Sequence, residues 1–290
     1  MESFQDLSFV IPARDEGATI AGLVAAILTK FSGAEVIVVN DGSEDSTGEL
    51  AEIAGARVLT HQRSLGNGAA IKSGARAASN PTLVFMDADG QHSPDDALLL
   101  VRRYREGWDM VVGARAGRRA QSSSLRWLGN AFYNRYASIL TGQSISDLTS
   151  GFRVVSRSKF MEVLHLLPNG FSYPTTSTIA LIRLGYSVDF SNVTVKPAEK
   201  GSHIRLFTDG VRFFVIIFKV TILFSPFKAL IPVSMASIFL GLILYLETYF
   251  TGVARFTNGM AMLLSSGVFT FAVALLAEQM TMLLYTDRNR

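Results

Sequence analysis

Two uncharged stretches in the last third of the sequence constrain the fold most. The first runs from Ala229 to Leu246 and the second from Gly259 to Ala277. Each comes close to the roughly 20 apolar residues that a helix needs to cross the hydrocarbon core of a bilayer. Buried core helices are the alternative, but such long apolar runs without polar breaks are rare in a soluble domain. The sequence therefore predicts two transmembrane helices joined by a loop near residues 251–258.

The basic residues around these stretches predict an orientation. Arg212, Lys219 and Lys228 precede the first stretch, Arg288 and Arg290 follow the second, and the loop offers Arg255. Because Lys and Arg gather on the cytoplasmic side, we expect an integral protein of the inner membrane with both termini in the cytoplasm. The polar N-terminal residues lack the pattern of a secretory signal. The absence of cysteine agrees with a reducing compartment, and the net charge of +3 gives no reason to expect a nucleic-acid partner.

Composition divides the chain into four parts. Residues 1–206 have the charges and turn signals of a globular domain, 207–228 form an amphipathic juxtamembrane region, 229–285 hold the two transmembrane helices, and 286–290 form a cytoplasmic tail. In the second part, Arg212 and Lys219 interrupt an otherwise apolar stretch. Such a stretch fits a helix lying along anionic headgroups, and a third membrane span is the alternative. Small residues in the spans would also permit an oligomer.

Short apolar runs alternate with helical patterns in the first part of the chain. The expected strands are Leu7–Ile11, Glu35–Asn40, Arg57–Thr60, Thr82–Met86 and Met110–Gly113. The expected helices are Glu16–Lys30, Glu44–Ala54, Gly68–Ala78 and Pro94–Tyr104, the last with Ser93 as its N-cap. This alternation is the signature of an α/β domain with a Rossmann-like, mostly parallel sheet.

Polar clusters follow three of these strands. They are residues 12–17 after the first strand, 40–46 after the second and 87–92 after the fourth. Because ligands bind beyond the carboxyl ends of parallel strands, we expect the clusters to face one edge of the sheet. There Asp41 could accept hydrogen bonds from a base or ribose, and Arg14 could balance phosphate charge. Turn and cap residues alone would explain a single cluster, but not the set.

Asp87 and Asp89 carry the clearest chemical signal. Two carboxylates at this spacing suit Mg²⁺ or Mn²⁺, which bind hard oxygen ligands and keep positions open for a substrate phosphate. Lys72, one turn into a glycine-led helix start, could approach a phosphate as well. A plain helix entry explains Lys72 equally well, because the segment matches neither a Walker loop nor the dinucleotide fingerprint.

Five segments carry a family resemblance. They are Ile-Pro-Ala-Arg-Asp-Glu at 11–16, Val-Val-Asn-Asp-Gly-Ser at 38–43, Gly-Asn-Gly at 66–68, Asp-Ala-Asp-Gly-Gln-His at 87–92, and Asp-Leu-Thr-Ser-Gly-Phe-Arg at 147–153. In this order and spacing the chain resembles the GT-A family 2 glycosyltransferases, and most closely the dolichol-phosphate mannose synthase-like enzymes. The likeness covers about residues 7–206, and the two C-terminal spans strengthen it.

The resemblance implies an enzyme that acts at the cytoplasmic membrane face. It would transfer a sugar, with inversion, from a GDP- or UDP-sugar to a polyprenyl phosphate such as undecaprenyl or dolichyl phosphate. The acceptor phosphate would attack the anomeric carbon, and Mg²⁺ or Mn²⁺ would bridge the leaving diphosphate. The fold would be a GT-A catalytic domain followed by an interfacial helix region and a transmembrane hairpin.

The resemblance also implies roles for individual residues. The metal ligands would be Asp87, Asp89 and Gln91. The donor would be bound by Pro12, Ala13, Arg14, Glu16, Asp41, Lys72, Asp87, Ala88, Arg153 and His203. The catalytic residues would be Asp89, Asp147, Arg115 and Arg126, with Asp147 as an orienting residue or weak base and the two arginines clasping the lipid phosphate. Solvated arginines that touch anionic headgroups are the alternative for Arg115 and Arg126.

The sequence departs from the family pattern in places, and two other functions stay open. Asp15 stands where the family often has Asn, Asn130 where some relatives have Ser, and His203 where relatives often have Lys, so His203 is either a donor contact or a surface residue. One rival is a processive polysaccharide synthase, whose Gln-x-x-Arg-Trp motif is broken here because Ser123 replaces the Gln. The other is a non-catalytic nucleotide-sugar-binding membrane protein.

Overall fold

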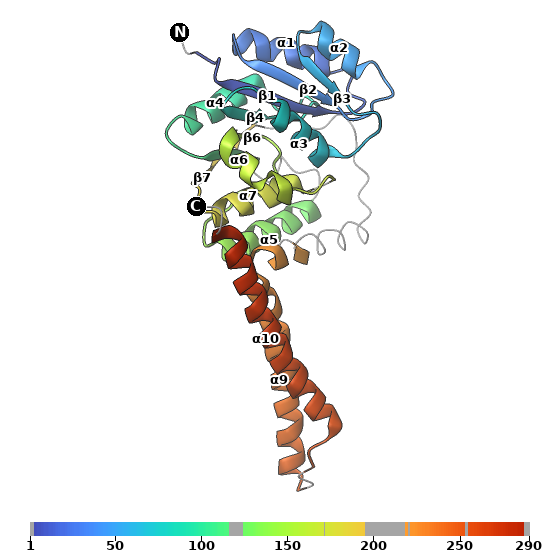
Figure 1. The fold of residues 1–290 in the computed structure, drawn as a ribbon, viewed down its shortest axis with the longest axis vertical. Coiled ribbons are helices and arrows are strands. Elements are labelled where there is room, and N and C mark those ends of the chain that lie inside the picture. The colour runs from blue at the N-terminus through green and yellow to red at the C-terminus, as the bar shows by residue number, and fades with distance from the viewer. Residues whose placement is uncertain are drawn as a thin grey trace. The chain divides into compact units, whose positions relative to one another are not determined.

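The chain forms two compact units, Met1–His203 and Ile204–Arg290. The computed structural model describes residues 3–115, 124–170, 172–194, 218–219, 221–252 and 255–286 (Figure 1). Within these ranges, the side chains of residues 124–130, 132, 140 and 284–286 lie outside the description.

A seven-stranded sheet forms the centre of the N-terminal unit, in the order β3-β2-β1-β4-β6-β5-β7. The strands are β1 Leu7–Ala13, β2 Glu35–Asn40, β3 Arg57–Thr60, β4 Thr82–Phe85, β5 Met110–Arg115, β6 Arg153–Ser156 and β7 Val188–Val193. Strand β6 runs antiparallel to β4 and β5, while the other pairs are parallel. The expected mostly parallel α/β sheet is therefore confirmed, and β6 and β7 add to the five strands expected from the sequence.

Seven α-helices of the described N-terminal unit surround this sheet. They are α1 Ile20–Lys30, α2 Thr47–Ile53, α3 Asn67–Ala77, α4 Pro94–Tyr104, α5 Ser124–Thr141, α6 Arg157–Val163 and α7 Tyr173–Arg183. Helix α4 has the predicted bounds, because Ser93 Oγ accepts the amide hydrogen of Asp96 at 3.2 Å and proline stands at the first turn. Helices α1 and α2 begin three or more residues later than expected, and α5 to α7 were not foreseen.

The two faces of the sheet are covered by different helices (Figure 1). On one face, Phe9 and Ile11 of β1 pack in a core cluster with side chains of α1 and α4 such as Val24 and Leu100. On the other face, a Cβ atom on Gly74 of α3 would meet side chains of β1 and β2, and Phe85 of β4 lies 4.8 Å from the ring of Phe160 on α6. Successive strand residues point to opposite faces, so a three-layer sandwich follows from the apolar strands.

Strand β1 is two residues longer than expected, and this places Pro12 and Ala13 inside the sheet rather than after it. Pro12 has no amide hydrogen, yet β1 is a central strand. The pairing explains this: β4 accompanies β1 only from Leu7 to Val10, while β2 continues to Ala13. Proline therefore sits where one neighbour has already ended, which is where a strand tolerates it.

Two long apolar helices dominate the described C-terminal unit. They are α9 Pro226–Phe250 and α10 Asn258–Thr286, and both are long and apolar enough to cross a membrane. The expected pair of apolar helices is confirmed, with α9 beginning three residues earlier than the predicted span. The predicted juxtamembrane region lies mostly outside the described residues; of it, residues 218–219 and 221–224 are helical.

Small residues bring α9 and α10 close together. Ser234 Oγ donates to the carbonyl of Gly267 at 2.8 Å, and a Cβ on Gly267 would lie 2.5 Å from a carbon of Ile238. A Cβ on Gly241 would lie 3.0 Å from Leu264. At the start of α9, Glu278 of α10 accepts the amide hydrogen of Phe227 at 3.1 Å, which satisfies a helix-terminal donor inside an apolar unit.

Candidate active site

Hydrogen bonds join the loops at the carboxyl edge of the sheet. The amide of Asp15 donates to Ser43 Oγ at 3.1 Å, and Asp15 Oδ1 accepts the amide hydrogen of Glu44 at 2.9 Å. Thr19 Oγ1 donates to the carbonyl of Ala88 at 2.7 Å, which attaches the loop after β4 to the start of α1. The three polar clusters therefore meet at one edge, as the sequence predicts.

The backbone at Asp15 explains a departure from the family pattern. Asp15 has a φ of +55°, in the left-handed region that few residues adopt. Asp and Asn are the non-glycine residues that enter this region most readily, because their short side chains bond locally. Asp in place of Asn therefore keeps the turn.

Asp41 is buried and accepts four hydrogen bonds from the protein. Its Oδ1 accepts the amide hydrogen of Leu65 at 2.9 Å and lies 2.6 Å from His61 Nδ1; its Oδ2 accepts from Ser64 Oγ and from the amide of Gly66, both at 2.8 Å. Burial acts to raise the pKa of Asp41, but these hydrogen bonds outweigh it and lower the pKa. A contact between Asp41 and a base requires one donor to give way, and the exposed Ser64 hydroxyl is the replaceable one.

Close packing shapes the turn beside Asp41. Gly42 has a φ of +68°, and a Cβ there would lie 2.6 Å from the amide nitrogen of Ser64. Arg14, half-exposed, donates to Ser64 Oγ at 3.2 Å, so its guanidinium lies over this network. The Asp-Gly-Ser segment thus forms a close-packed turn, and its aspartate belongs to a polar hydrogen-bond network.

Asp87 and Asp89 form the acidic centre of the site. Burial, together with the neighbouring charge of Asp89, raises the pKa of Asp87 to about 6. The charges of Arg115 and Arg153 oppose this rise without cancelling it. Asp89 is exposed, and its Oδ1 accepts the amide hydrogen of Gln91 at 3.0 Å. The loop after β4 therefore carries two carboxylates whose negative charge is only partly balanced.

This donor set fits a divalent cation that shares its ligands with a substrate. The described residues contain no group of three or more His, Cys, Asp or Glu side chains able to hold a metal ion. Asp87, Asp89 and the side-chain oxygen of Gln91 instead offer a few hard oxygen ligands. Mg²⁺ or Mn²⁺ bound to a nucleotide takes its other ligands from phosphate and water. A cation would also relieve the repulsion that raises the pKa of Asp87.

Arg115 and Asp147 face each other across the next part of the site. Arg115 Nε and Nη2 donate to the two carboxylate oxygens of Asp147 at 2.7 and 3.0 Å, and Nη2 also donates to Thr149 Oγ1 at 2.5 Å. Burial acts to raise the pKa of Asp147, but the hydrogen bonds and charge of Arg115 outweigh it and lower the pKa. Of the two predicted roles for Asp147, this geometry favours the orienting residue, because a carboxylate so held is a poor base.

Arg153 requires a correction. The resemblance implied that it contacts the donor, but its side chain is fully buried. Nη1 donates to the carbonyl of Pro174 and to Ser177 Oγ, and Nη2 donates to the carbonyl of Ser150. Carbonyl and hydroxyl groups inside the fold thus hold the guanidinium. Its positive charge partly balances that of Asp87, but the side chain is too buried to contact a ligand.

Lys72 requires a second correction. Its ammonium donates to the carbonyl of Leu167 at 3.0 Å and to Asn169 Oδ1, and the amides at the start of α3 donate to carbonyls of the same loop. A Cβ on Gly68 would overlap the carbonyl oxygen of Pro168. The glycine-led start of α3 is therefore a packing site for residues 167–170, and the plain helix entry is the better explanation.

The remaining predicted residues lie as follows. The backbones of Pro12 and Ala13 are part of β1, and Ala13 O accepts the amide hydrogen of Asp41 at 2.9 Å. The amide of Glu16 donates to Thr47 Oγ1 at 2.9 Å. The side chain of Arg126, on α5, and the whole of His203 lie outside the described residues. Their roles stay predictions.

Three site residues were not singled out from the sequence. His61 connects Asp41 to Ser73 Oγ, which its Nε2 approaches at 2.9 Å. Tyr173 donates to the carbonyl of Gly151 at 3.0 Å and lies beside Asp87. The ring of His92 stacks on Phe152 with centroids 4.5 Å apart. Of these three, only His92 could have been found from the sequence, because it belongs to the 87–92 cluster. His61 and Tyr173 reach the site through contacts with segments far away in the sequence.

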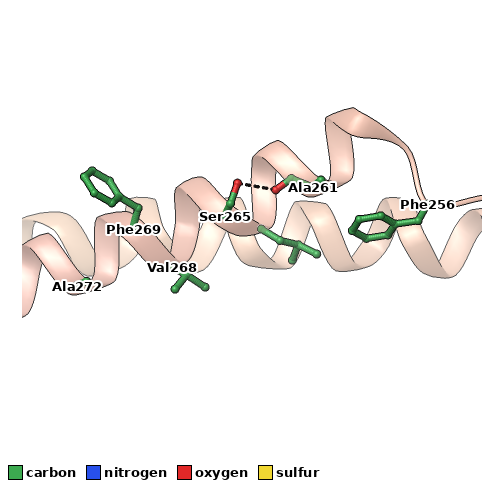
Figure 2. Close-up of a pocket in the computed structure, with 7 residues that line it drawn as sticks. Phe256, Ala261, Ser265, Val268, Phe269 and Ala272 are labelled. Carbon is green, nitrogen blue, oxygen red and sulfur yellow. Dashed lines mark hydrogen bonds between the residues drawn. The ribbon is translucent and has the colours of Figure 1, made fainter.

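An apolar groove on α10 is of a different kind (Figure 2). It has a volume of about 600 Å³ and is lined by Phe256, Ala261, Leu264, Ser265, Val268, Phe269 and Ala272. Ser265 is the one polar side chain among these residues, and its hydroxyl donates back to the carbonyl of Ala261.

Comparisons with known proteins agree with this division of the chain. The model of glycosyl transferase family 2 matches residues 8–164, and the model of the GtrB C-terminal hairpin matches residues 225–283. The glucosyl-3-phosphoglycerate synthase of Mycobacterium tuberculosis, crystallised with Mn²⁺, UDP and glucosyl-3-phosphoglycerate, superposes with a TM-score of 0.58. It shares 26% identity, over 74% of this chain and 78% of that one.

Two curated relatives are named for a lipid phosphate, and a third is named only as a glycosyltransferase. The dolichyl-phosphate hexose transferase of Haloferax volcanii is 32% identical over 164 residues, 56% of this chain and 70% of that protein. The undecaprenyl-phosphate 4-deoxy-4-formamido-L-arabinose transferase of Yersinia pestis is 29% identical over 194 residues, 60% of this chain and 59% of that protein. The glycosyltransferase AglJ of Haloferax volcanii is 30% identical over 198 residues, 67% of this chain.

The matched part of the chain spans 64% of the length of AglJ, so the similarity does not extend over the whole of that protein. The expected GT-A domain with two apolar C-terminal helices is confirmed by the family matches and the solved synthase. Because the family model covers more than half of the sequence, the chain belongs to glycosyl transferase family 2.

Proposed function

We propose that the protein transfers a sugar from a nucleotide-sugar donor to a polyprenyl phosphate. One observation carries this proposal. The site contains two carboxylates suited to a cation, Asp87 and Asp89, and also a guanidinium, that of Arg115, which the carboxylate of Asp147 holds in place. One group of residues suits a leaving diphosphate and the other suits an acceptor anion. The names of the dolichyl-phosphate and undecaprenyl-phosphate transferases support this pairing of substrates.

On the donor side, Asp87, Asp89 and Gln91 would hold Mg²⁺ or Mn²⁺. The cation, when bound, would neutralise the charge that develops on the departing diphosphate. The residues themselves supply the anchoring oxygens, while Asp41 and Arg14 line the region where the nucleoside would lie. The Mn²⁺ and UDP in the related synthase support a metal and a nucleotide of this class.

On the acceptor side, Arg115 would bind the lipid phosphate. Its side chain is about a quarter exposed, and Asp147 and Thr149 fix the plane of the guanidinium, so the remaining N–H groups are pre-oriented. A phosphate acceptor is already ionised near neutral pH and needs little help from a general base. The lowered pKa of Asp147 is compatible with this, since no residue has to remove a proton.

The proposed reaction is a single displacement. An oxygen of the lipid phosphate forms a bond to the anomeric carbon while the bond from that carbon to the donor's diphosphate oxygen breaks. The nucleoside diphosphate leaves with the electron pair, and the configuration at the anomeric carbon inverts. Holding two anions within reach of each other is the main task of the protein, which positions them and screens their charges.

The same proposal includes a membrane location. The lengths and hydropathy of α9 and α10 and the match to a C-terminal hairpin support an integral membrane protein. We propose the earlier four-part division of the chain, with both termini and the catalytic domain on the cytoplasmic side, from the distribution of Arg and Lys around the helices.

Replacing Asp89 by Ala tests this function. Asp89→Ala should reduce transfer by about three orders of magnitude or more, since it removes a metal ligand, while the protein stays folded. Asp95→Ala is the matched control: that carboxylate is also exposed, on α4, and should leave turnover unchanged. The assay uses purified full-length protein, Mn²⁺, undecaprenyl phosphate and labelled GDP- and UDP-sugars. Near wild-type turnover by Asp89→Ala would refute the metal role, and metal-dependent donor binding without any transfer would favour a sensor.

A further inference from the structure

Buried polar atoms without hydrogen-bond partners occur in two segments of the proposed site. In the described part of the chain, His92 Nδ1, Ser150 Oγ and Arg153 Nε have no partner; His92 follows the loop at 87–91, and the other two flank Gly151, where a Cβ would lie 3.2 Å from Asp87 Oδ2. Leaving a buried polar atom unpaired costs free energy, so a folded protein keeps such atoms where a purpose requires them. Among them, His92 has the most informative surroundings.

The ring of His92 is clamped against Phe152. The two ring planes are 24° apart, His92 is 8% exposed and Phe152 is fully buried. Phe152 is itself fixed on β5: its carbonyl accepts the amide hydrogen of Gly113 at 2.9 Å, and a Cβ on Gly113 would lie 2.7 Å from the Phe152 ring. The stack thus joins the carboxylate loop, residues 87–91, to the segment that follows Asp147.

The charges around His92 come from both halves of the proposed site. The charged groups that act on His92 are Asp89 of the proposed donor half, Arg115 and Asp147 of the proposed acceptor half, and Asp96 on α4. Nearby, a Cβ on Gly151 would lie 3.2 Å from Asp87 Oδ2, so the two segments approach each other closely. Groups from both halves of the proposed site therefore act electrostatically on His92.

Packing alone does not explain a histidine here. A phenylalanine would stack on Phe152 equally well and would bury no unpaired nitrogen. We propose that His92 is a positioning residue for donor binding. Its ring holds the carboxylate loop against Phe152, and its Nδ1 is kept for a hydrogen bond to that loop, formed when the diphosphate draws the loop inward. This inference rests on the proposed function, because it assumes a nucleoside diphosphate at Asp87 and Asp89.

The test compares His92→Phe with His92→Ala in the full-length protein. His92→Phe keeps the stack and removes the nitrogen, so its melting temperature should equal or exceed that of the wild type. Its affinity for UDP or GDP with Mn²⁺, measured by calorimetry, should fall at least tenfold. His92→Ala should lose both stability and affinity. Val163→Ala, a buried change on α6, is the control that lowers the melting temperature without altering affinity.

The outcomes separate this inference from the proposed function. If His92→Phe binds the diphosphate and turns over like the wild type, the ring alone matters and the inference is refuted. If the wild type binds the diphosphate but labels no lipid, the proposed function fails while the comparison of His92 variants still stands. If the wild type binds neither UDP nor GDP with Mn²⁺, both are overturned.

Discussion

At the scale of single residues, the candidate site holds two carboxylates, Asp87 and Asp147, in different electrostatic environments. Asp87 is half-buried with its charge only partly balanced, whereas Asp147 is buried and paired with Arg115. The sequence marked both as candidates from their motifs alone. It could not show how each carboxylate is held, because the pKa of each depends on partners far away in the chain.

Asp87→Asn should stabilise the protein in the absence of metal. The pKa of Asp87 is raised from 3.8 to about 6, so the folded state binds more protons than the unfolded state between these values. Stability of the wild type should therefore fall as pH rises from about 4 to 6, and Asp87→Asn should lack that fall. Each unit by which the pKa is raised contributes at most about 1.4 kcal/mol. At pH 7 the variant should therefore be more stable than the wild type by about 1–3 kcal/mol. Thermal unfolding in EDTA at pH 4.5 and 7 measures it; an unchanged pH profile in the variant would contradict the assignment.

Asp147→Asn should weaken transfer more than donor binding. The change removes a charged partner of Arg115 and leaves the guanidinium poorly oriented, so turnover should fall about 100-fold while the affinity for nucleoside diphosphate changes little. Asp189→Asn is the matched control, because it breaks the Arg103–Asp189 pair of 2.6 Å at a more exposed position. Equal turnover losses in the two variants would show that ion pairing in general, not the orientation of Arg115, limits the reaction.

At the scale of elements, local signals decided what could be predicted. Helix α4 was predicted to the residue, since Ser93 and Pro94 mark its start within the sequence itself. Helix α7 also follows a serine and has proline in its first turn, but Ser172 has a φ of +84° and makes no side-chain cap hydrogen bond. The destination of Arg153 was likewise out of reach, because its partners lie on α7 and on the turn before β6. Tertiary contacts fixed what local preference left open.

Gly68→Ala should test the close packing at the start of α3. A Cβ there would overlap the carbonyl oxygen of Pro168, so the 167–170 loop must move and the free energy of unfolding should drop by about 2 kcal/mol or more. Gly22→Ala, on α1, has no atom within 4 Å of its Cβ and should stabilise by about 0.5–1 kcal/mol. Chemical unfolding of both variants gives the comparison. Equal effects would mean that the α3 start is as open as the surface of α1.

At the scale of the whole molecule, the chain combines a catalytic sheet with a membrane-length hairpin. Five of the seven strands and the two apolar helices followed from hydrophobic patterns, whereas the order of the strands in the sheet was not predicted. The close contact of α9 and α10 uses Ser234, Gly241 and Gly267, and such pairing depends on the facing helix. A hairpin of this kind suits a substrate that is itself embedded in lipid, and the central claim concerns that substrate.

The most direct test offers the full-length protein two acceptors that differ only in a phosphate. Undecaprenyl phosphate and undecaprenol are each incubated with Mn²⁺ and labelled nucleotide sugars, and lipid products are analysed for mass and anomeric configuration. Transfer should occur to the phosphate alone, at least 100-fold faster than to the alcohol, with inversion at the anomeric carbon. Labelling of undecaprenol at a similar rate, or no labelled lipid with any donor, would contradict a phosphate acceptor held by Arg115.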